Sequence, residues 1–155
     1  MIAAGFSKRE QVIALLDGGV DVNVRNEDGS TALMKAAYSV GPKAKDMVEL
    51  LLQRKADPRI QDKTGKTAMM LTSLSGMGDP VGVIEMLLAA NASPNAKDQA
   101  GKTALMFAAE SSHANAVSII AALTKDGSCQ VNAQCEDGSS ALCLAVKTHK
   151  RNVRD

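Results

Sequence analysis

Three cysteines and a histidine near the C-terminal end of the sequence are the residues whose types best suit metal binding. Cys129, Cys135, Cys143 and His149 are separated by five, seven and five residues. Thiolates and imidazoles bind zinc, but structural zinc sites usually carry closer pairs of the CxxC type. The spacing therefore favours ordinary free thiols, and we expect no metal. An odd number of cysteines without a disulfide framework also favours a reducing compartment, the cytoplasm or the nucleus.

Catalytic chemistry finds little support in the sequence. His113 and His149 are the two histidines, and neither has a nucleophile partner at a recognisable spacing. His149 is expected in a loop between two helices, among basic residues. The glycines belong to turns and form no phosphate-binding loop. We therefore expect no enzyme activity and no cofactor.

Charge and apolar patterning restrict the classes of partner. The net charge of +1 gives no general attraction to nucleic acid or anionic lipid. One tyrosine, two phenylalanines and no tryptophan provide no platform on which unpaired bases could stack. No apolar run approaches the roughly 20 residues needed to cross a membrane. A basic segment at 147–154 keeps nucleic-acid binding open as an alternative, although a solvated end of the chain is favoured.

One six-residue sequence phrase occurs four times and indicates the elements that must position these residues. It reads GSTALM, GKTAMM, GKTALM and GSSALC at residues 29–34, 65–70, 101–106 and 138–143. Its glycines are 36, 36 and 37 residues apart. A period in this range indicates a stack of small units, none of which can bury its apolar face without its neighbours.

Each unit reads as a turn followed by two helices. In the second unit, residues 26–29 carry turn chemistry, and Thr31 suits the N-cap of a short helix over 32–38. The Val-Gly-Pro sequence at 40–42 predicts a break, because glycine ends helices well and proline begins the next one. A longer helix is predicted over 44–53 from its apolar spacing. The sequence therefore predicts an all-α fold.

This pattern resembles the ankyrin repeat family. Residues 98–109, DQAGKTALMFAA, match the family phrase D-x-x-G-x-T-P-L-H-x-A-A, and residues 19–23, GVDVN, match its G-A-D-V-N return. The resemblance implies one solenoid over residues 1–155, made of stacked helix–loop–helix units joined by β-turn fingertips. Its expected boundaries are a partial repeat at 1–24, repeats at 25–60, 61–96 and 97–133, and a partial repeat at 134–155.

The departures from the family phrase affect its packing. Alanine replaces the family proline in every copy, and it is a good helix former at the first helical position. The family histidine is replaced by Met34, Met70, Met106 and Cys143. We expect these four side chains to point inward and to pack as core residues.

The resemblance also implies a function. Ankyrin stacks present their turn tips and inner helices as one extended concave surface that binds other proteins. The expected function is a protein–protein interaction module, a scaffold or adaptor, acting as a monomer and belonging to a larger protein. The alternative is a non-catalytic regulatory or targeting domain of a multidomain enzyme or channel.

The family's variable surface positions can be carried over onto this sequence. They give the expected protein-binding residues Arg25, Glu27, Asp28, Tyr38, Lys63, Lys66, Leu74, Lys97, Lys102, Glu110, Glu136 and Asp137. Dominant contacts are often aromatic or arginine, which favours Tyr38 and Arg25. Acidic tips lie at both ends of the set, and four lysines lie between them. We therefore expect the partner to be an extended segment with acidic residues at its centre.

One asparagine is a candidate for covalent modification. Ankyrin repeats resemble known substrates of an asparaginyl hydroxylase that favours a leucine eight residues before its target, and Leu15 and Asn23 fit that pattern. The alternative is that Asn23 forms a hydrogen bond within its own turn. In protein from animal tissue, mass spectrometry of the intact peptide would find one added oxygen on Asn23 if it is modified. An unmodified peptide would remove the hypothesis.

Overall fold

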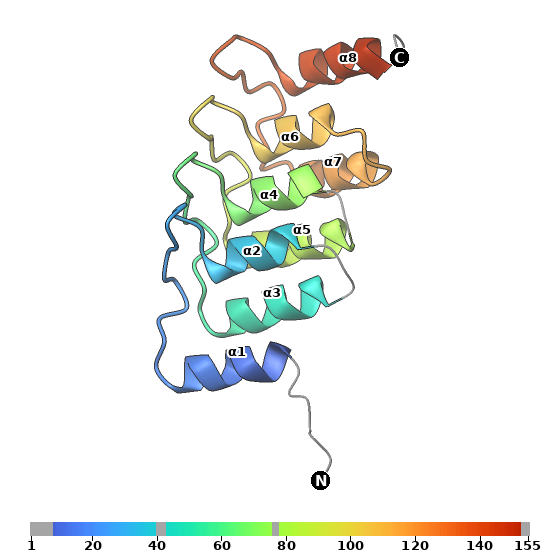
Figure 1. The fold of residues 1–155 in the computed structure, drawn as a ribbon. Helices are drawn as coiled ribbons and strands as arrows, with labels where there is room; N and C mark the ends of the chain where they lie inside the picture. The colour runs from blue at the N-terminus through green and yellow to red at the C-terminus, as the bar shows by residue number, and fades with distance from the viewer. Residues whose placement is uncertain (1–7, 40–42, 76–77, 153–155) are drawn as a thin grey trace.

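The chain forms a stack of short helices (Figure 1). The structure is a computed structural model that describes residues 8–39, 43–75 and 78–152, with the backbone alone for 149–152. Within these residues the elements are α1 (Lys8–Asp17), α2 (Ala32–Tyr38), α3 (Ala44–Gln53), α4 (Ala68–Ser75), α5 (Pro80–Ala89), α6 (Ala104–Glu110), α7 (Ala116–Thr124) and α8 (Ala141–Asn152). The predicted all-α fold is confirmed.

The helices lie in two rows. In the inner row α2, α4, α6 and α8 pack in succession, and in the outer row α3, α5 and α7 do the same. Each of the pairs α2–α3, α4–α5 and α6–α7 is an antiparallel unit that packs on the next. The segments that lead into the inner helices project together on one side of the stack (Figure 1).

Helix starts follow the chemistry predicted from the sequence. Thr31 has extended backbone before α2, and its hydroxyl accepts a hydrogen bond from the Met34 amide at 3.4 Å. Thr67 makes the same bond to the Met70 amide before α4. Such caps satisfy amides that have no partner within the helix. The predicted bounds of α2 and α3 are confirmed, whereas the predicted break at 40–42 lies outside the described residues.

The methionines of the repeated phrase are core residues. Met34, Met70 and Met106 are all fully buried, and they belong to one continuous cluster that runs through the stack. This confirms that apolar packing takes the place of the family histidine. Long, unbranched methionine side chains fill irregular gaps well.

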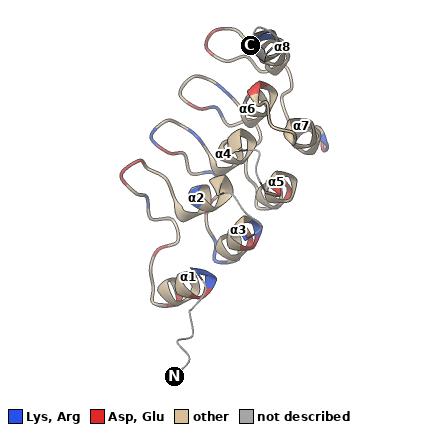
Figure 2. Cartoon of the chain, turned by 45° about the vertical axis from the view of Figure 1, so that its right-hand side comes forward, with Lys and Arg blue, Asp and Glu red and all other residues tan. Residues whose placement is uncertain are grey.

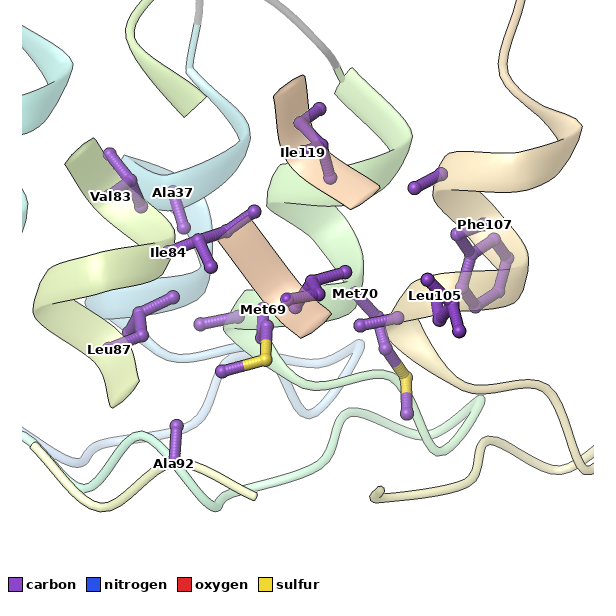
Figure 3. Packing of buried hydrophobic residues seen from close by; sticks show 14 of the residues in the cluster. Ala37, Met69, Met70, Val83, Ile84, Leu87, Ala92, Leu105, Phe107 and Ile119 are labelled. Atoms are coloured by element: carbon purple, nitrogen blue, oxygen red, sulfur yellow. The ribbon is translucent and has the colours of Figure 1, made fainter. Parts of the chain in front are cut away.

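Each inner helix contributes to two layers of this core. In α4, Met69 lies toward Leu87 of α5, whereas Met70 lies toward Leu105 of α6 (Figure 3). One helix therefore packs both within its own unit and against the next. This arrangement explains why the apolar surface of a unit is buried only when a neighbour is present.

The prediction for Cys143 is wrong, because its side chain is exposed. The helix that carries it, α8, packs on α6, which buries Leu144 on one side. Among the described residues no further unit covers the other side, where Leu142 is 76% exposed. The prediction of a loop at His149 is also wrong, because α8 continues through it to Asn152.

At one glycine, Gly65, two projecting segments lie too close together to leave room for a side chain. The backbone amide of Gln99 donates to the carbonyl of Thr64 at 3.0 Å, joining two neighbouring segments. Gly65 lies beside this bond with a φ of 81°, and a Cβ atom there would meet the Gln99 nitrogen at 2.7 Å. Gly138 has the same backbone conformation, with a φ of 76°, but an added Cβ would meet nothing within 4 Å.

Replacing these two glycines by alanine separates backbone strain from packing. Gly138→Ala is expected to cost about 1–2 kcal/mol, the penalty of a left-handed conformation. Gly65→Ala is expected to cost about 1–3 kcal/mol more, because its Cβ also collides with the neighbouring backbone. Urea unfolding of both variants measures the difference. Equal losses of stability would contradict the close contact.

The first helix is expected to open most easily. No residue of α1 is fully buried, and Val12 and Leu16 are only partly covered by the core. An ion pair of 2.7 Å between Asp17 and Arg54 of the next unit adds a partly exposed contact. Amides of α1 should therefore exchange with solvent faster than those of α4 and α6, as measured by hydrogen exchange. Equal protection in the three helices would contradict this.

Candidate functional site

The segments before the inner helices are tight turns organised by one side chain each. We call them fingertips 1 to 4, at residues 25–30, 61–66, 97–102 and 134–139. In fingertip 2, the Asp62 carboxylate accepts hydrogen bonds from the amides of Thr64 and Lys66 at 2.8 and 3.0 Å. Burial opposes ionisation of Asp62, but a hydrogen bond from the Thr64 hydroxyl at 2.7 Å, together with these two amide bonds, outweighs it and lowers the pKa of the carboxyl group. Asn26 and Asp98 organise fingertips 1 and 3 in the same way.

Fingertip 4 uses different chemistry for the same turn. Cys135 occupies the position of Asp98, 37 residues later. The Asp137 carboxylate accepts the thiol of Cys135 at 3.0 Å and the amide of Ser139 at 2.8 Å. These bonds, led by that of the thiol, hold the pKa of Asp137 well below its usual range. The bond to the Asp137 carboxylate also raises the pKa of the Cys135 thiol. Asp137, predicted to bind a partner, therefore also shapes its own turn.

Neighbouring fingertips are joined by a ladder of side chains. The Arg25 guanidinium donates to the backbone carbonyl of Gln61 at 2.7 Å. The side-chain amide of Gln61 donates in turn to the backbone carbonyl of Lys97 at 2.8 Å. The Lys97 ammonium then donates to the Gln134 carbonyl at 2.9 Å. These side chains stand at the same place in successive units. Arg25 and Lys97, both predicted to bind a partner, thus hold the stack together.

Three of the predicted residues meet around one aromatic ring. The ammonium groups of Lys66 and Lys102 lie 5.9 and 5.8 Å from the centroid of Phe107, which is 7% exposed. These distances suit cation–π attraction. The Lys102 ammonium also contacts both Glu110 carboxylate oxygens, at 2.9 and 2.7 Å. We call Lys66, Lys102, Glu110 and Phe107 the lysine–phenylalanine cluster.

Two predicted apolar contacts are open to solvent. Tyr38 and Leu74 are 50% and 39% exposed. They occupy equivalent places in the last turns of α2 and α4, which pack side by side. Glu110 occupies the same place in α6. Tyr38, Leu74 and the cluster thus follow one another along the inner row of helices, and we call this face the inner surface.

The charges on the fingertips differ between the ends and the middle of the stack. Figure 2 shows acidic residues on the outermost fingertips, whereas the two fingertips between them carry basic residues as well as acidic ones. Glu27, Lys63 and Glu136 are exposed, and their side chains have no hydrogen bond or ion pair within the described ranges. Asp28 makes one long contact of 3.5 Å with Asn26. These side chains are available to a ligand.

Asn23 makes a contact that the sequence did not predict. Its side-chain oxygen accepts the amide of Asp57, in the return segment of the next unit, at 2.8 Å. Asn95 makes the equivalent bond to the Gln130 amide at 2.7 Å. These asparagines therefore bridge neighbouring units. Hydroxylation of Asn23 stays a prediction.

The three cysteines considered for metal binding form no group of metal ligands among the described residues. Cys129 and Cys135 are buried and Cys143 is exposed, and all three are free thiols. In the part of the chain that the structure describes, no three histidine, cysteine, aspartate or glutamate side chains are grouped as a metal ion would require. His113 is exposed in the loop before α7, and the side chain of His149 lies outside the described residues. Among the described helices, none has the length and apolar character to cross a membrane.

Comparison with known proteins identifies the stack. Residues 1–98 and 74–154 match the family model described as ankyrin repeats (3 copies). A comparison with curated proteins finds no match. The two family matches together cover nearly the whole chain, and the paired helices and fingertips agree with them. The chain therefore belongs to the ankyrin repeat family.

Proposed function

We propose that this chain binds an extended segment of a partner protein along the inner surface. Ankyrin repeats are generally protein-interaction modules. The observation that carries the proposal is the exposure of Tyr38 and Leu74 at equivalent places on neighbouring helices. Lys66, which forms no ion pair with a described carboxylate, belongs to the same unit as Leu74. A segment that follows the stack would meet apolar and basic contacts in succession.

The apolar contacts supply the anchoring part of the surface. Tyrosine is enriched among the residues that dominate protein interfaces, because its ring buries a large area at a low cost in conformational entropy. Tyr38 and Leu74 together offer a partner an aromatic and an aliphatic contact. The proposed segment carries an apolar side chain for this place.

Of the four lysines expected to form a basic patch, two are engaged by a carbonyl or a carboxylate of the chain itself and two remain for a partner. Lys97 donates to the Gln134 carbonyl, and Lys102 is paired with Glu110. Lys63 and Lys66 have no ion pair with any carboxylate that the structure describes. Both belong to fingertip 2, in the same unit as Leu74. The proposed segment therefore carries its acidic residue beside its apolar anchor.

Reversing the two free charges tests the basic contact. A library of random peptides displayed on phage should yield binders that carry acidic and apolar residues together. Lys63→Glu combined with Lys66→Glu should slow the association of these peptides several-fold at low salt and flatten its salt dependence, because the steering charge is reversed. Lys8→Glu combined with Arg9→Glu on α1 makes the same change of net charge and should leave the rate close to that of the unmodified protein.

Truncating the apolar anchor tests the other half of the surface. Tyr38→Ala should weaken the same peptides by about 1 kcal/mol or more, roughly fivefold in Kd, through faster dissociation. Surface plasmon resonance measures both rates. If the selected peptides bind the Lys63/Lys66 variant and the Tyr38 variant with the same affinity as the unmodified protein, their binding site lies elsewhere on the chain.

A further inference from the structure

The lysine–phenylalanine cluster holds an unequal number of opposite charges. Lys66 and Lys102 approach the ring of Phe107 from two neighbouring units. Glu110 pairs with Lys102 through both of its oxygens. The hydrogen bond of the Lys66 ammonium is to the neutral hydroxyl of Thr64, at 3.0 Å. Asp62 in the same fingertip interacts electrostatically with this ammonium but forms no ion pair with it. Within the cluster, two ammonium groups thus face one carboxylate.

The carboxylate of Glu110 is not required by the repeat scaffold. The same place is held by Tyr38 in α2, Leu74 in α4 and Lys147 in α8. These units form the same fingertip and inner helix, although the place carries an aromatic, an aliphatic or a basic side chain. Glu110 is therefore a particular feature of α6.

The pair that Glu110 forms lies across the path of a segment bound along the inner surface. Lys102 is the last residue of fingertip 3, and Glu110 is the last residue of α6. Their contact connects the base of the fingertip to the end of the helix, eight residues further on. Both side chains are partly exposed, at 27% and 32%, so a bound segment would contact them.

We infer that Glu110 sets the charge that the partner segment must carry. This inference rests on the proposed function. Glu110 forms the ion pair with Lys102 that a partner carboxylate would otherwise form. Lys66 then remains to bind one acidic residue of the partner. A second acidic residue one unit further along would meet Glu110 and be repelled. The site thereby selects a segment with one acidic residue followed by neutral ones.

Two synthetic peptides test this selection. Neighbouring helices in a stack are about 10 Å apart, which corresponds to roughly three residues of extended chain. The probes are ten-residue peptides of serine and leucine that contain either one glutamate or two glutamates three residues apart. Their Kd values are measured by NMR titration of the ¹⁵N-labelled chain, which also shows the residues that each peptide contacts.

The unmodified protein should bind the two-glutamate peptide more weakly than the one-glutamate peptide, because Glu110 repels the second glutamate. Glu110→Gln should bind the two-glutamate peptide about 1.4- to 5-fold more tightly than the one-glutamate peptide, the ratio expected for one exposed ion pair. Glu110→Leu, which copies the residue of α4, should change the preference in the same direction. Glu136→Gln removes an equal charge from fingertip 4 and should leave the preference unchanged.

The outcomes separate the inference from the proposed function. If both peptides shift amides of fingertip 2 and α4, but Glu110→Gln gives the same ratio of Kd values as the unmodified protein, the inference is overturned and the proposed function stands. An equal gain in Glu136→Gln would also overturn it, because the effect would then be one of net charge. If neither peptide shifts these amides in any variant, both are overturned.

Discussion

The structure depends on the contact that each unit makes with the next at an interval of about 36 residues. Met69 and Met70 show the apolar part of this contact, since one helix packs toward its own unit and toward its neighbour. The polar part is the ladder in which Arg25, Gln61 and Lys97 donate to carbonyls one unit away. Units of this size bury too little surface to be stable alone. Stability and shape are therefore properties of neighbouring pairs.

This constraint divides the surface residues into two classes. Side chains at the beginning of the fingertips are used to join units, and their charges are directed to backbone carbonyls. At the tips and at the ends of the inner helices, the side chains of Tyr38, Lys63 and Leu74 have no such contact, whereas Gln99 donates to the Lys63 carbonyl of the neighbouring unit. Tyr38, Lys63 and Leu74, whose side chains the stack does not use, form the part of the proposed binding surface that is free for a partner. A change at Lys63 should thus affect binding more than folding.

The periodic features could be predicted from the sequence, because every unit repeats the same local solution. The bounds of α2 and the burial of Met34 followed from turn chemistry and from the place of each residue in the phrase. The same reasoning failed for Cys143, because its burial requires a neighbouring unit on both sides. The repeat period assigns each residue to a position within its unit. Whether that position is buried depends on the neighbouring units.

The candidate site was predictable in outline but not in its electrostatics. The sequence indicated which positions lie on the surface, and it grouped Lys97 and Lys102 with Lys63 and Lys66. It could not indicate that Lys97 reaches the Gln134 carbonyl or that Lys102 reaches Glu110, because these contacts depend on the directions of long side chains. A comparison of residues 36 apart would have revealed the ladder, since Arg25, Gln61 and Lys97 are all long donors.

Site-specific cross-linking tests most directly whether the residues that the stack leaves unused form the binding surface. A photoreactive benzoylphenylalanine at position 74 lies on the inner surface, and the same residue at position 8 lies on α1. After irradiation with a selected peptide, mass spectrometry should find the adduct at position 74 and little at position 8. Adducts of equal yield at both positions, or at position 8 alone, would contradict this account of the molecule.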